Sequence, residues 1–298
     1  LNISLRKISM MEAEATGRAA VTGNPGDVYL EDALVLAYSI KNKATIKLDD
    51  SSRLIIRSED DLDSTHKLIH QTLKHFNIIS PLRIDYSSTI PFKCGLGGSA
   101  AILVSLIACL NKKFNLNLSL TDISKHALYI EHELKINAGW QDRAAAVFGS
   151  SLINCKNFTC QKLTAIPQEM YIIYYGKNHS SKDVHKKGKE KSNEEFLSLM
   201  KKTREITLKA HTTLQEKNWK KLGILMNKNW EIRESTLGLT KEDKFVKDLV
   251  FENKGFANQT GSGGAAIVLD LDKKLKPIFE ENKMRIIQPV LNGGLKIK

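Results

Sequence analysis

The spacing of apolar and polar positions divides the chain into short strand-like segments and longer helical ones. In the first third, runs of aliphatic and β-branched residues predict short strands around one helical stretch, residues 64–76. A sheet with helices laid against it is therefore expected. The predicted strands are residues 19–21, 44–48, 54–56 and 82–86.

Two longer apolar helices are predicted next, at residues 99–110 and at about 121–135. Ser119 and Asp122 have the spacing of a capping box, in which each side chain accepts a hydrogen bond from the other residue's backbone N–H, so the second helix is expected to begin there. Residues 140–148 predict a further helix. In the second long helix, the apolar positions that recur at helical spacing are Ile123, Ala127, Ile130 and Leu134.

The second half of the chain has strands and helices of its own, which predicts two domains, residues 1–160 and 161–298. A strand-like run at 151–155 ends the first half, and a strand-rich unit begins at 170–175. Because strands alternate with helices and no repeat of solenoid period is present, the fold class is expected to be α+β. The other predicted elements are helices at about 193–214, 219–232 and 243–253, and strands at 265–269 and 285–288.

Residues 91–101, PFKCGLGGSAA, have the composition of a phosphate-binding loop that leads into a helix. Gly95, Gly97 and Gly98 lack the Cβ atom that would keep a polyanion away from backbone N–H groups. From Ser99 onward the composition is that of a buried helix, whose unpaired N–H groups and dipole attract anions. The segment matches neither Gly-x-x-x-x-Gly-Lys-Ser/Thr nor Gly-x-Gly-x-x-Gly. It therefore predicts a phosphate site of another kind.

Three motifs resemble those of the GHMP kinases, named for galactokinase, homoserine kinase, mevalonate kinase and phosphomevalonate kinase. They are residues 17–27, 91–101 and 259–266, in the family's order. The resemblance implies an N-terminal ribosomal-protein-like α+β domain that binds ATP, a C-terminal ferredoxin-like α/β sandwich and a cleft between them. It also implies ATP and Mg²⁺ as cofactors and a small molecule, a sugar or uronic acid, as acceptor.

Within that superfamily, residues 23–29, 138–143 and 226–233 resemble the glucuronokinases. This resemblance implies phosphorylation of the anomeric hydroxyl of D-glucuronate to give glucuronate 1-phosphate. Asn24 and Pro25 stand where galactokinase-like and mevalonate-kinase-like enzymes usually carry Glu-His. Galactose, arabinose, mevalonate and homoserine remain open as acceptors, and so does a non-catalytic, ligand-sensing relative.

The resemblance also assigns the catalytic residues. Ser99 and Glu131 would hold Mg²⁺, a hard ion that takes oxygen ligands, and Asp142 would accept the proton of the acceptor hydroxyl. Arg18 stands where many relatives carry a catalytic Lys, and its fixed charge can stabilise the phosphoryl group but cannot act as an acid or base. The ATP phosphates are expected on Gly95, Leu96, Gly97, Gly98, Ser99 and Ala100, beside a C-terminal glycine loop of Gly261, Ser262, Gly263 and Gly264.

Residues for the acceptor are expected on a tight turn and among the cations. Asn24 and Asp27 can bond to sugar hydroxyls because the turn that carries them fixes their side chains. The carboxylate of a uronic acid also needs a cation. Arg143, next to Asp142, is the first candidate, and Lys182 and Arg233 are the second.

The chain has 298 residues and a formal charge of +12, from 45 basic and 33 acidic residues. The excess suits an anionic ligand. Much of it lies in residues 177–191, which we expect to form either a solvated loop or a lid over the substrate. Because this run has no interleaved aromatic residues for base stacking, no nucleic-acid partner is expected.

No apolar run approaches the ~20 residues that span a bilayer, and residues 1–10 lack the apolar stretch of a secretory signal. No membrane partner is therefore expected. Four cysteines are too few for a disulfide scaffold and lack metal-ligand spacing. A cytoplasmic monomer or homodimer is the expected form. The cysteines are Cys94, Cys109, Cys155 and Cys160.

Overall fold

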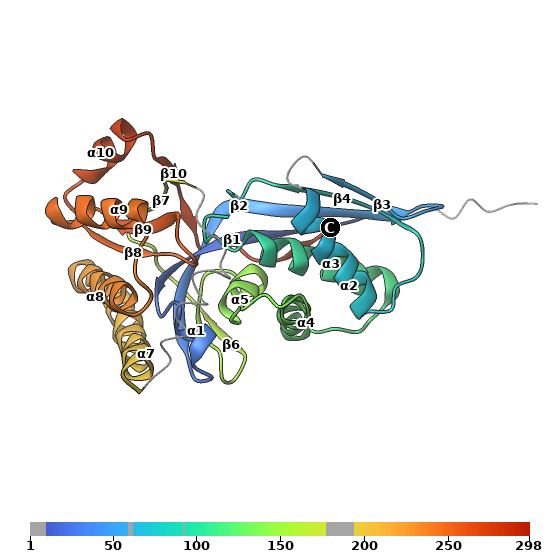
Figure 1. Cartoon of the computed structure of the whole chain (residues 1–298), viewed down its shortest axis with the longest axis horizontal. Coiled ribbons are helices and arrows are strands. Elements are labelled where there is room, and N and C mark those ends of the chain that lie inside the picture. Colours follow the sequence, from blue (N-terminus) through green and yellow to red (C-terminus); the bar gives the residue numbers. More distant parts are fainter. Residues whose placement is uncertain (1–9, 59–61, 92, 177–193) are drawn as a thin grey trace, which may run out of the picture.

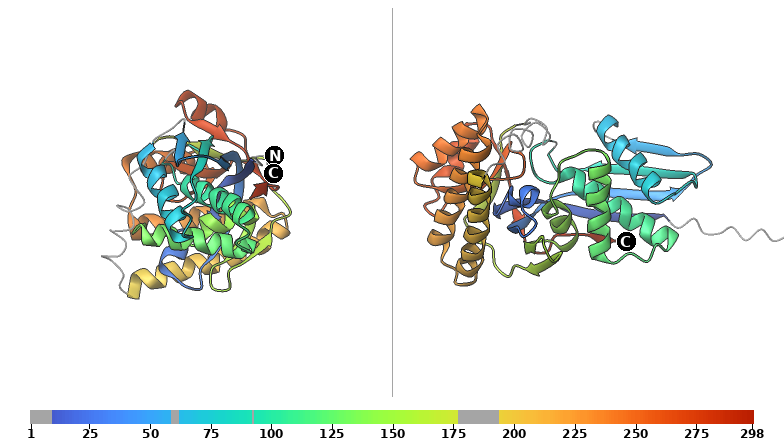
Figure 2. Two further views of the ribbon diagram at one scale, coloured as in Figure 1. Left: turned by 90° about the vertical axis from the view of Figure 1, so that its right-hand side faces the viewer. Right: turned by 60° about the horizontal axis from the view of Figure 1, so that its bottom comes forward.

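The computed structural model describes residues 10–58, 62–91, 93–176 and 194–298. They form two β-sheets, each with helices packed against it (Figure 1). The larger sheet and the helices α2 to α5 make one side of the molecule, and the smaller sheet with α7 to α10 makes the other (Figure 2). The mixture of helices and antiparallel-rich sheets confirms the predicted α+β class.

The larger sheet is built around β2 (Leu34–Asp50). This strand pairs antiparallel with β1 (Met11–Thr22) on one side and with β4 (Leu82–Ser88) on the other. β3 (Ile55–Ser58) runs parallel to β4, and the chain crosses over between them through helix α2 (Leu62–His75). The other strands of this sheet are β5 (Ser151–Asn154), β6 (Thr159–Lys162), β11 (Pro289–Val290) and β12 (Lys296–Ile297).

Helix α3 (Gly98–Phe114) is the centre of the N-terminal core. Its residues 100–110 are all buried, as expected for a helix that is apolar on every side. It packs on β1 and β2 and contacts α2, α4 (Leu120–Glu133) and α5 (Gln141–Phe148). The predicted capping box is confirmed, since Ser119 accepts from the Asp122 N–H and Asp122 accepts from the Ser119 N–H.

The smaller sheet has four antiparallel strands in the order β10–β7–β9–β8. Trp230, Val250 and Phe279 bury their side chains between this sheet and its helices. The strands are β7 (Met170–Tyr174), β8 (Phe256–Gln259), β9 (Ala265–Leu269) and β10 (Arg285–Ile287). The helices are α7 (Glu194–Gln215), α8 (Trp219–Leu237), α9 (Lys241–Glu252) and α10 (Leu275–Glu281).

The structure differs from the sequence prediction mainly in its strands. β1 and β2 are far longer than predicted, while β6, β8, β11, β12 and α10 were not predicted at all. The last strand returns to the larger sheet, where Ile297 lies opposite Ala13 of β1. The end of the chain thus packs with the N-terminal half, although a division at residue 160 assigns it to the second domain. No helix in the described ranges is long and apolar enough to cross a membrane.

Candidate active site

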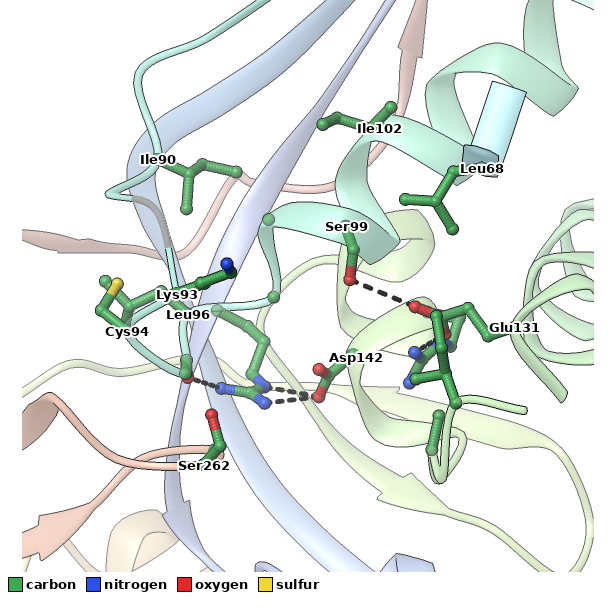
Figure 3. A pocket seen from close by; sticks show the side chains of 18 of the residues that line it. Leu68, Ile90, Lys93, Cys94, Leu96, Ser99, Ile102, Glu131, Asp142 and Ser262 are labelled. Atoms are coloured by element: carbon green, nitrogen blue, oxygen red, sulfur yellow. Dashed lines mark hydrogen bonds and ion pairs between the residues drawn. The ribbon is translucent and has the colours of Figure 1, made fainter. Parts of the chain in front are cut away.

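Most of the predicted site residues line one cavity of about 460 Å³, enclosed by β1, the helices α1 (Gly26–Tyr29) to α5 and the loop that follows β8. One part of its wall is apolar, with Leu68, Ile90 and Ile102, and the rest carries the charged groups (Figure 3). The predicted residues on the wall are Arg18, Asp27, Gly95, Leu96, Gly97, Gly98, Ser99, Glu131, Asp142, Arg143, Gly261 and Ser262.

The glycine-rich segment turns tightly against the C-terminal glycine loop before α3 begins. Gly95 and Gly97 have φ angles of 69° and 75°, in the left-handed region that glycine adopts without strain. A Cβ atom on Gly95 would lie 2.3 Å from the Thr260 carbonyl oxygen, and one on Gly97 would lie 3.5 Å from the Arg18 Cγ. The loop therefore reaches the start of α3 directly beside Arg18. Ala100 is buried inside the helix and does not line the cavity.

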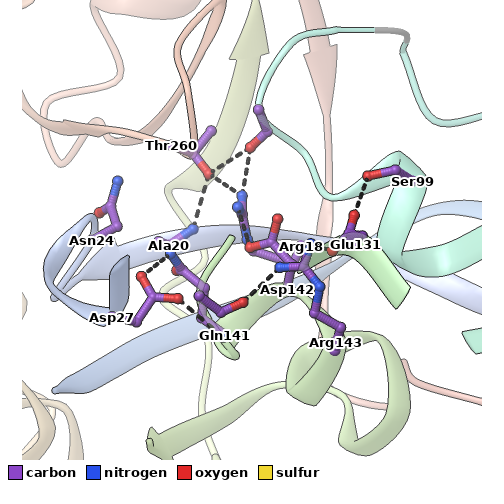
Figure 4. A network of polar contacts seen from close by, with 12 residues as sticks. Arg18, Ala20, Asn24, Asp27, Ser99, Glu131, Gln141, Asp142, Arg143 and Thr260 are labelled. Carbon is purple, nitrogen blue, oxygen red and sulfur yellow. Dashed lines mark hydrogen bonds and ion pairs between the residues drawn. The ribbon is translucent and has the colours of Figure 1, made fainter. Parts of the chain in front are cut away.

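Arg18 fixes the carboxylate of Asp142. The guanidinium, 2% exposed, donates from Nε at 2.9 Å and from Nη2 at 2.5 Å to the same oxygen, Asp142 Oδ1 (Figure 4). Its Nη1 donates to the Gly95 carbonyl at 2.5 Å and to Thr260 Oγ1 at 2.9 Å. Arg18 thus joins β1, the glycine-rich loop, the C-terminal glycine loop and α5. With Oδ1 bonded to Arg18, Oδ2 is the oxygen of Asp142 that is suited to accept a proton.

Glu131 and Ser99 bring oxygen atoms together at the first turn of α3. The Glu131 side chain is buried, and its Oε1 accepts from Ser99 Oγ at 3.1 Å. Within the described residues no three His, Cys, Asp or Glu side chains form a metal-binding group, so a metal ion here would take few protein ligands. That donor set fits Mg²⁺, which keeps waters and substrate phosphates in its coordination shell.

Arg143 lies against the same glutamate. Its Nη2 forms an ion pair with Glu131 Oε2, and its Nη1 donates to the Gly139 carbonyl at 2.6 Å. Both side chains are almost completely buried. Burial lowers the pKa of Arg143 to about 9, because removing a cation from water disfavours the charged form. The residue predicted to bind a substrate carboxylate is therefore already engaged with a carboxylate of the protein.

Asp27 is held by Gln141, a residue that sequence reasoning did not select. Asp27 accepts from the Gln141 backbone N–H at 3.2 Å and from its Nε2 at 2.6 Å. Gly139 is needed beside it, since a Cβ there would lie 2.0 Å from Asp27 Oδ2. Burial, with a further contribution from the charge of Asp142, raises the pKa of Asp27 to about 6.

The Asp27 carboxylate is expected to make acceptor binding pH-dependent. Above pH 6 both carboxylate oxygens accept hydrogen bonds, whereas below pH 6 the group is protonated, so that one oxygen becomes an O–H donor and the negative charge is lost. We therefore expect the KM of the acceptor to rise as pH falls through about 6, and Asp27→Asn to give a higher KM without this step. Steady-state kinetics between about pH 5 and pH 8, a range that includes the pKa of Asp27, would test this. Asp32→Asn, at a half-exposed residue paired with Arg204, is the control and should keep the wild-type profile.

Other predicted residues lie away from the cavity. Asn24 is fully buried, where its Nδ2 donates to the Gln259 carbonyl and its Oδ1 accepts from Asn258 Nδ2, so it joins the turn after β1 to β8. Arg233 is 1% exposed and donates to Gln259 Oε1. Neither residue lines the cavity, and their roles as substrate contacts stay predictions. Gly263 and Gly264 do not line the cavity either, and Lys182 lies outside the described residues.

Comparisons with known proteins identify the relatives of this chain. The family described as GHMP kinases N terminal domain matches residues 64–150. The chain is 25% identical to probable glucuronokinase 2 of Arabidopsis thaliana, over 97% of this chain and 93% of that protein. It is 27% identical to a mevalonate kinase of Archaeoglobus fulgidus, over 90% of this chain and 94% of that protein.

Two solved structures share the fold across nearly their whole length. The Lin0012 protein from Listeria innocua superposes with a TM-score of 0.80 at 17% identity, covering 97% of this chain and 99% of that one. The L. major mevalonate kinase in complex with R-mevalonate has a TM-score of 0.75 at 18% identity, with the same coverage. Together with the glycine-rich loop, the family match and the full-length relatives, these results place the chain in the GHMP kinase superfamily, and its curated relatives indicate a phosphotransferase that acts on an alcohol group.

Proposed function

We propose that this protein transfers the γ-phosphoryl group of ATP to the anomeric hydroxyl of D-glucuronate and releases glucuronate 1-phosphate. The observation that carries the proposal is the carboxylate of Asp142, which lines the cavity beside the loop 95–99 and is fixed by Arg18. The choice of glucuronate is supported by two relatives named glucuronokinase, at 25% and 26% identity.

In this proposal the ATP phosphates lie on the loop 95–99 and the start of α3. Backbone N–H groups at a helix N-terminus stabilise anions without a change in their own charge. Ser99 Oγ and Glu131 Oε1 would hold Mg²⁺, which when bound neutralises charge on the phosphate oxygens. The apolar wall of Leu68 and Ile102 suits the adenine ring.

Transfer requires that the acceptor hydroxyl lose its proton as its oxygen attacks the γ-phosphorus. The new oxygen–phosphorus bond forms while the bond to the β,γ-bridging oxygen breaks, and ADP leaves with that electron pair. Asp142 Oδ2 takes the proton, because Oδ1 is bonded to Arg18. Arg18 remains charged throughout and stabilises the carboxylate and the nearby phosphate charge. An anomeric hydroxyl is more acidic than a simple alcohol, so a positioned carboxylate suffices as the base.

A panel of acceptors tests the substrate. Purified protein is incubated with ATP, Mg²⁺ and one of glucuronate, galactose, arabinose, mevalonate or homoserine, and the products are identified by ³¹P NMR. We expect the highest kcat/KM with glucuronate and a glycosyl phosphate signal. A higher kcat/KM for another acceptor would replace glucuronate, and no ATP consumption with any of them would contradict the enzymatic proposal.

Arg143→Ala is expected to lower kcat/KM for every acceptor that the enzyme uses, and not for glucuronate alone. The reason is that the guanidinium bonds to Glu131 and Gly139, so its loss leaves a buried carboxylate without its counter-ion. Kinetics with glucuronate and with a neutral sugar measure the difference. A loss confined to glucuronate would instead assign Arg143 to the substrate carboxylate.

We further propose that the chain has two functional domains, divided near residue 160. The first would supply the phosphate loop, the metal ligands and the base. The second would supply the loop with Gly261 and Ser262 that closes the cavity. The strands β11 and β12 would then be a C-terminal extension that returns to the first domain.

A further inference from the structure

The ion pair between Arg143 and Glu131 lies at the position proposed for the metal ion. Glu131 has two carboxylate oxygens, and the protein itself contacts both of them: Ser99 Oγ donates to Oε1, and Arg143 Nη2 pairs with Oε2. The Arg143 side chain is 4% exposed and the Glu131 side chain 1%. A divalent cation that approaches Glu131 therefore meets a carboxylate whose charge is already neutralised.

The guanidinium is held in this position by a second contact. Arg143 Nη1 donates to the Gly139 carbonyl at 2.6 Å, within the turn that precedes α5. Arg143 and Asp142 are neighbours on the first turn of α5, and Asp142 pairs with Arg18. Asp142 is thus paired with Arg18, and Glu131 with Arg143. A bare metal ion would have to displace one of these arginines from a buried site.

The net charge of the cavity wall also disfavours the binding of a bare metal ion. Its described residues include four basic and three acidic side chains, a formal excess of one positive charge. Such a wall repels a free divalent cation but attracts a metal–nucleotide complex, which is a net anion. The basic residues are Arg18, Lys67, Lys93 and Arg143, and the acidic ones are Asp27, Glu131 and Asp142.

We infer that Arg143 is an internal counter-ion of Glu131 that competes with the divalent cation, so that the protein takes up its metal together with the nucleotide and not before it. The inference rests on the proposed function only in that the site accepts a metal–nucleotide complex. When the phosphates bind, their negative charge allows the guanidinium and the metal ion to share the site. Arg143 is thus a positioning residue that sets the order in which metal and nucleotide bind.

The test is Mn²⁺ binding to the nucleotide-free protein, measured by EPR in solution. Wild-type protein is expected to bind Mn²⁺ weakly. Arg143→Gln leaves Glu131 without a competing cation, so its affinity for Mn²⁺ should rise by about tenfold or more. Adding Glu131→Gln to that variant should abolish the gain, and Arg143→Lys, which keeps the charge, should bind as weakly as wild type. Affinity in Arg143→Gln that is equal to or lower than wild type would overturn the inference.

A second measurement keeps the inference testable if Arg143→Gln does not fold, as judged by circular dichroism. Glu131→Gln in the wild-type background should leave Mn²⁺ binding to the nucleotide-free protein unchanged. The same variant should lower the affinity for Mn²⁺ in the complex with a non-hydrolysable ATP analogue by about tenfold. Loss of Mn²⁺ binding from the nucleotide-free protein in Glu131→Gln would show that the metal reaches Glu131 without nucleotide, which contradicts the inference. Neither measurement uses an acceptor or turnover, so a different substrate would overturn the proposed reaction and leave these results standing.

Discussion

Asp142→Asn is expected to lower kcat by about 10²–10⁴-fold, the range by which general-base catalysis contributes to enzymatic rates. Asparagine keeps Oδ1 as an acceptor for Arg18, so the side chain can stay in place. Its amide nitrogen replaces Oδ2, however, and cannot accept the proton of the acceptor hydroxyl. The expected loss therefore falls on the chemical step, while the ATP site formed by the loop 95–99 is preserved.

Nucleotide binding and turnover must be measured separately for this variant. Calorimetry with a non-hydrolysable ATP analogue should give an affinity close to that of wild type, and single-turnover kinetics should give the reduced rate. Asp272→Asn, at a surface residue 62% exposed, is the matched control and should retain both. Wild-type turnover in Asp142→Asn would remove Asp142 from the proposed mechanism. A loss of affinity for the ATP analogue would show that Asp142 maintains the structure of the ATP site.

The local pattern of the sequence predicted the helices better than the strands. Helix α3 was predicted because its apolar residues form a continuous buried run, and α4 because Ser119 and Asp122 mark its start. β2 was recognised only at 44–48, although it extends from residue 34 to 50. Polar residues at 41–43 interrupt its apolar pattern, and its pairing with four other strands, which stabilises it, is not encoded in local sequence.

Part of the site could also be predicted, because its motifs fix backbone positions. Glycines at 95 and 97 allow the loop to turn toward α3, and the residues around it follow from the family resemblance. The pairing of side chains could not be predicted in the same way. Asn24 bonds to Gln259, 235 residues away, and Arg143 pairs with Glu131. Such contacts depend on how distant segments pack, which residue spacing does not determine.

Gly95→Ala is expected to destabilise the fold and to weaken ATP binding together. The φ of Gly95 is 69°, where an L-residue costs about 1–2 kcal/mol. The added Cβ would also lie 2.3 Å from the carbonyl oxygen of Thr260, a backbone atom that cannot rotate away. We expect at least about 2 kcal/mol of lost unfolding free energy. That corresponds to a fall in Tm of roughly 3 °C or more for a chain of this size.

ATP binding by the loop 95–99 should be weakened by the same steric conflict between the added Cβ and Thr260. To accommodate the methyl group, the loop 95–99 must move away from Thr260, and the Gly95 carbonyl then loses the hydrogen bonds that it accepts from Arg18 Nη1 and Thr260 Oγ1. The KM for ATP should rise by about tenfold or more, since a shift near 1 Å is costly at a site that works by positioning. Gly98→Ala is the local control for stability, because its Cβ would meet only Ile90 at 3.6 Å and its Tm should not fall. Gly176→Ala, whose Cβ would meet no atom within 4 Å, is the control for activity. A wild-type Tm and KM in Gly95→Ala would mean that the two glycine loops do not depend on each other.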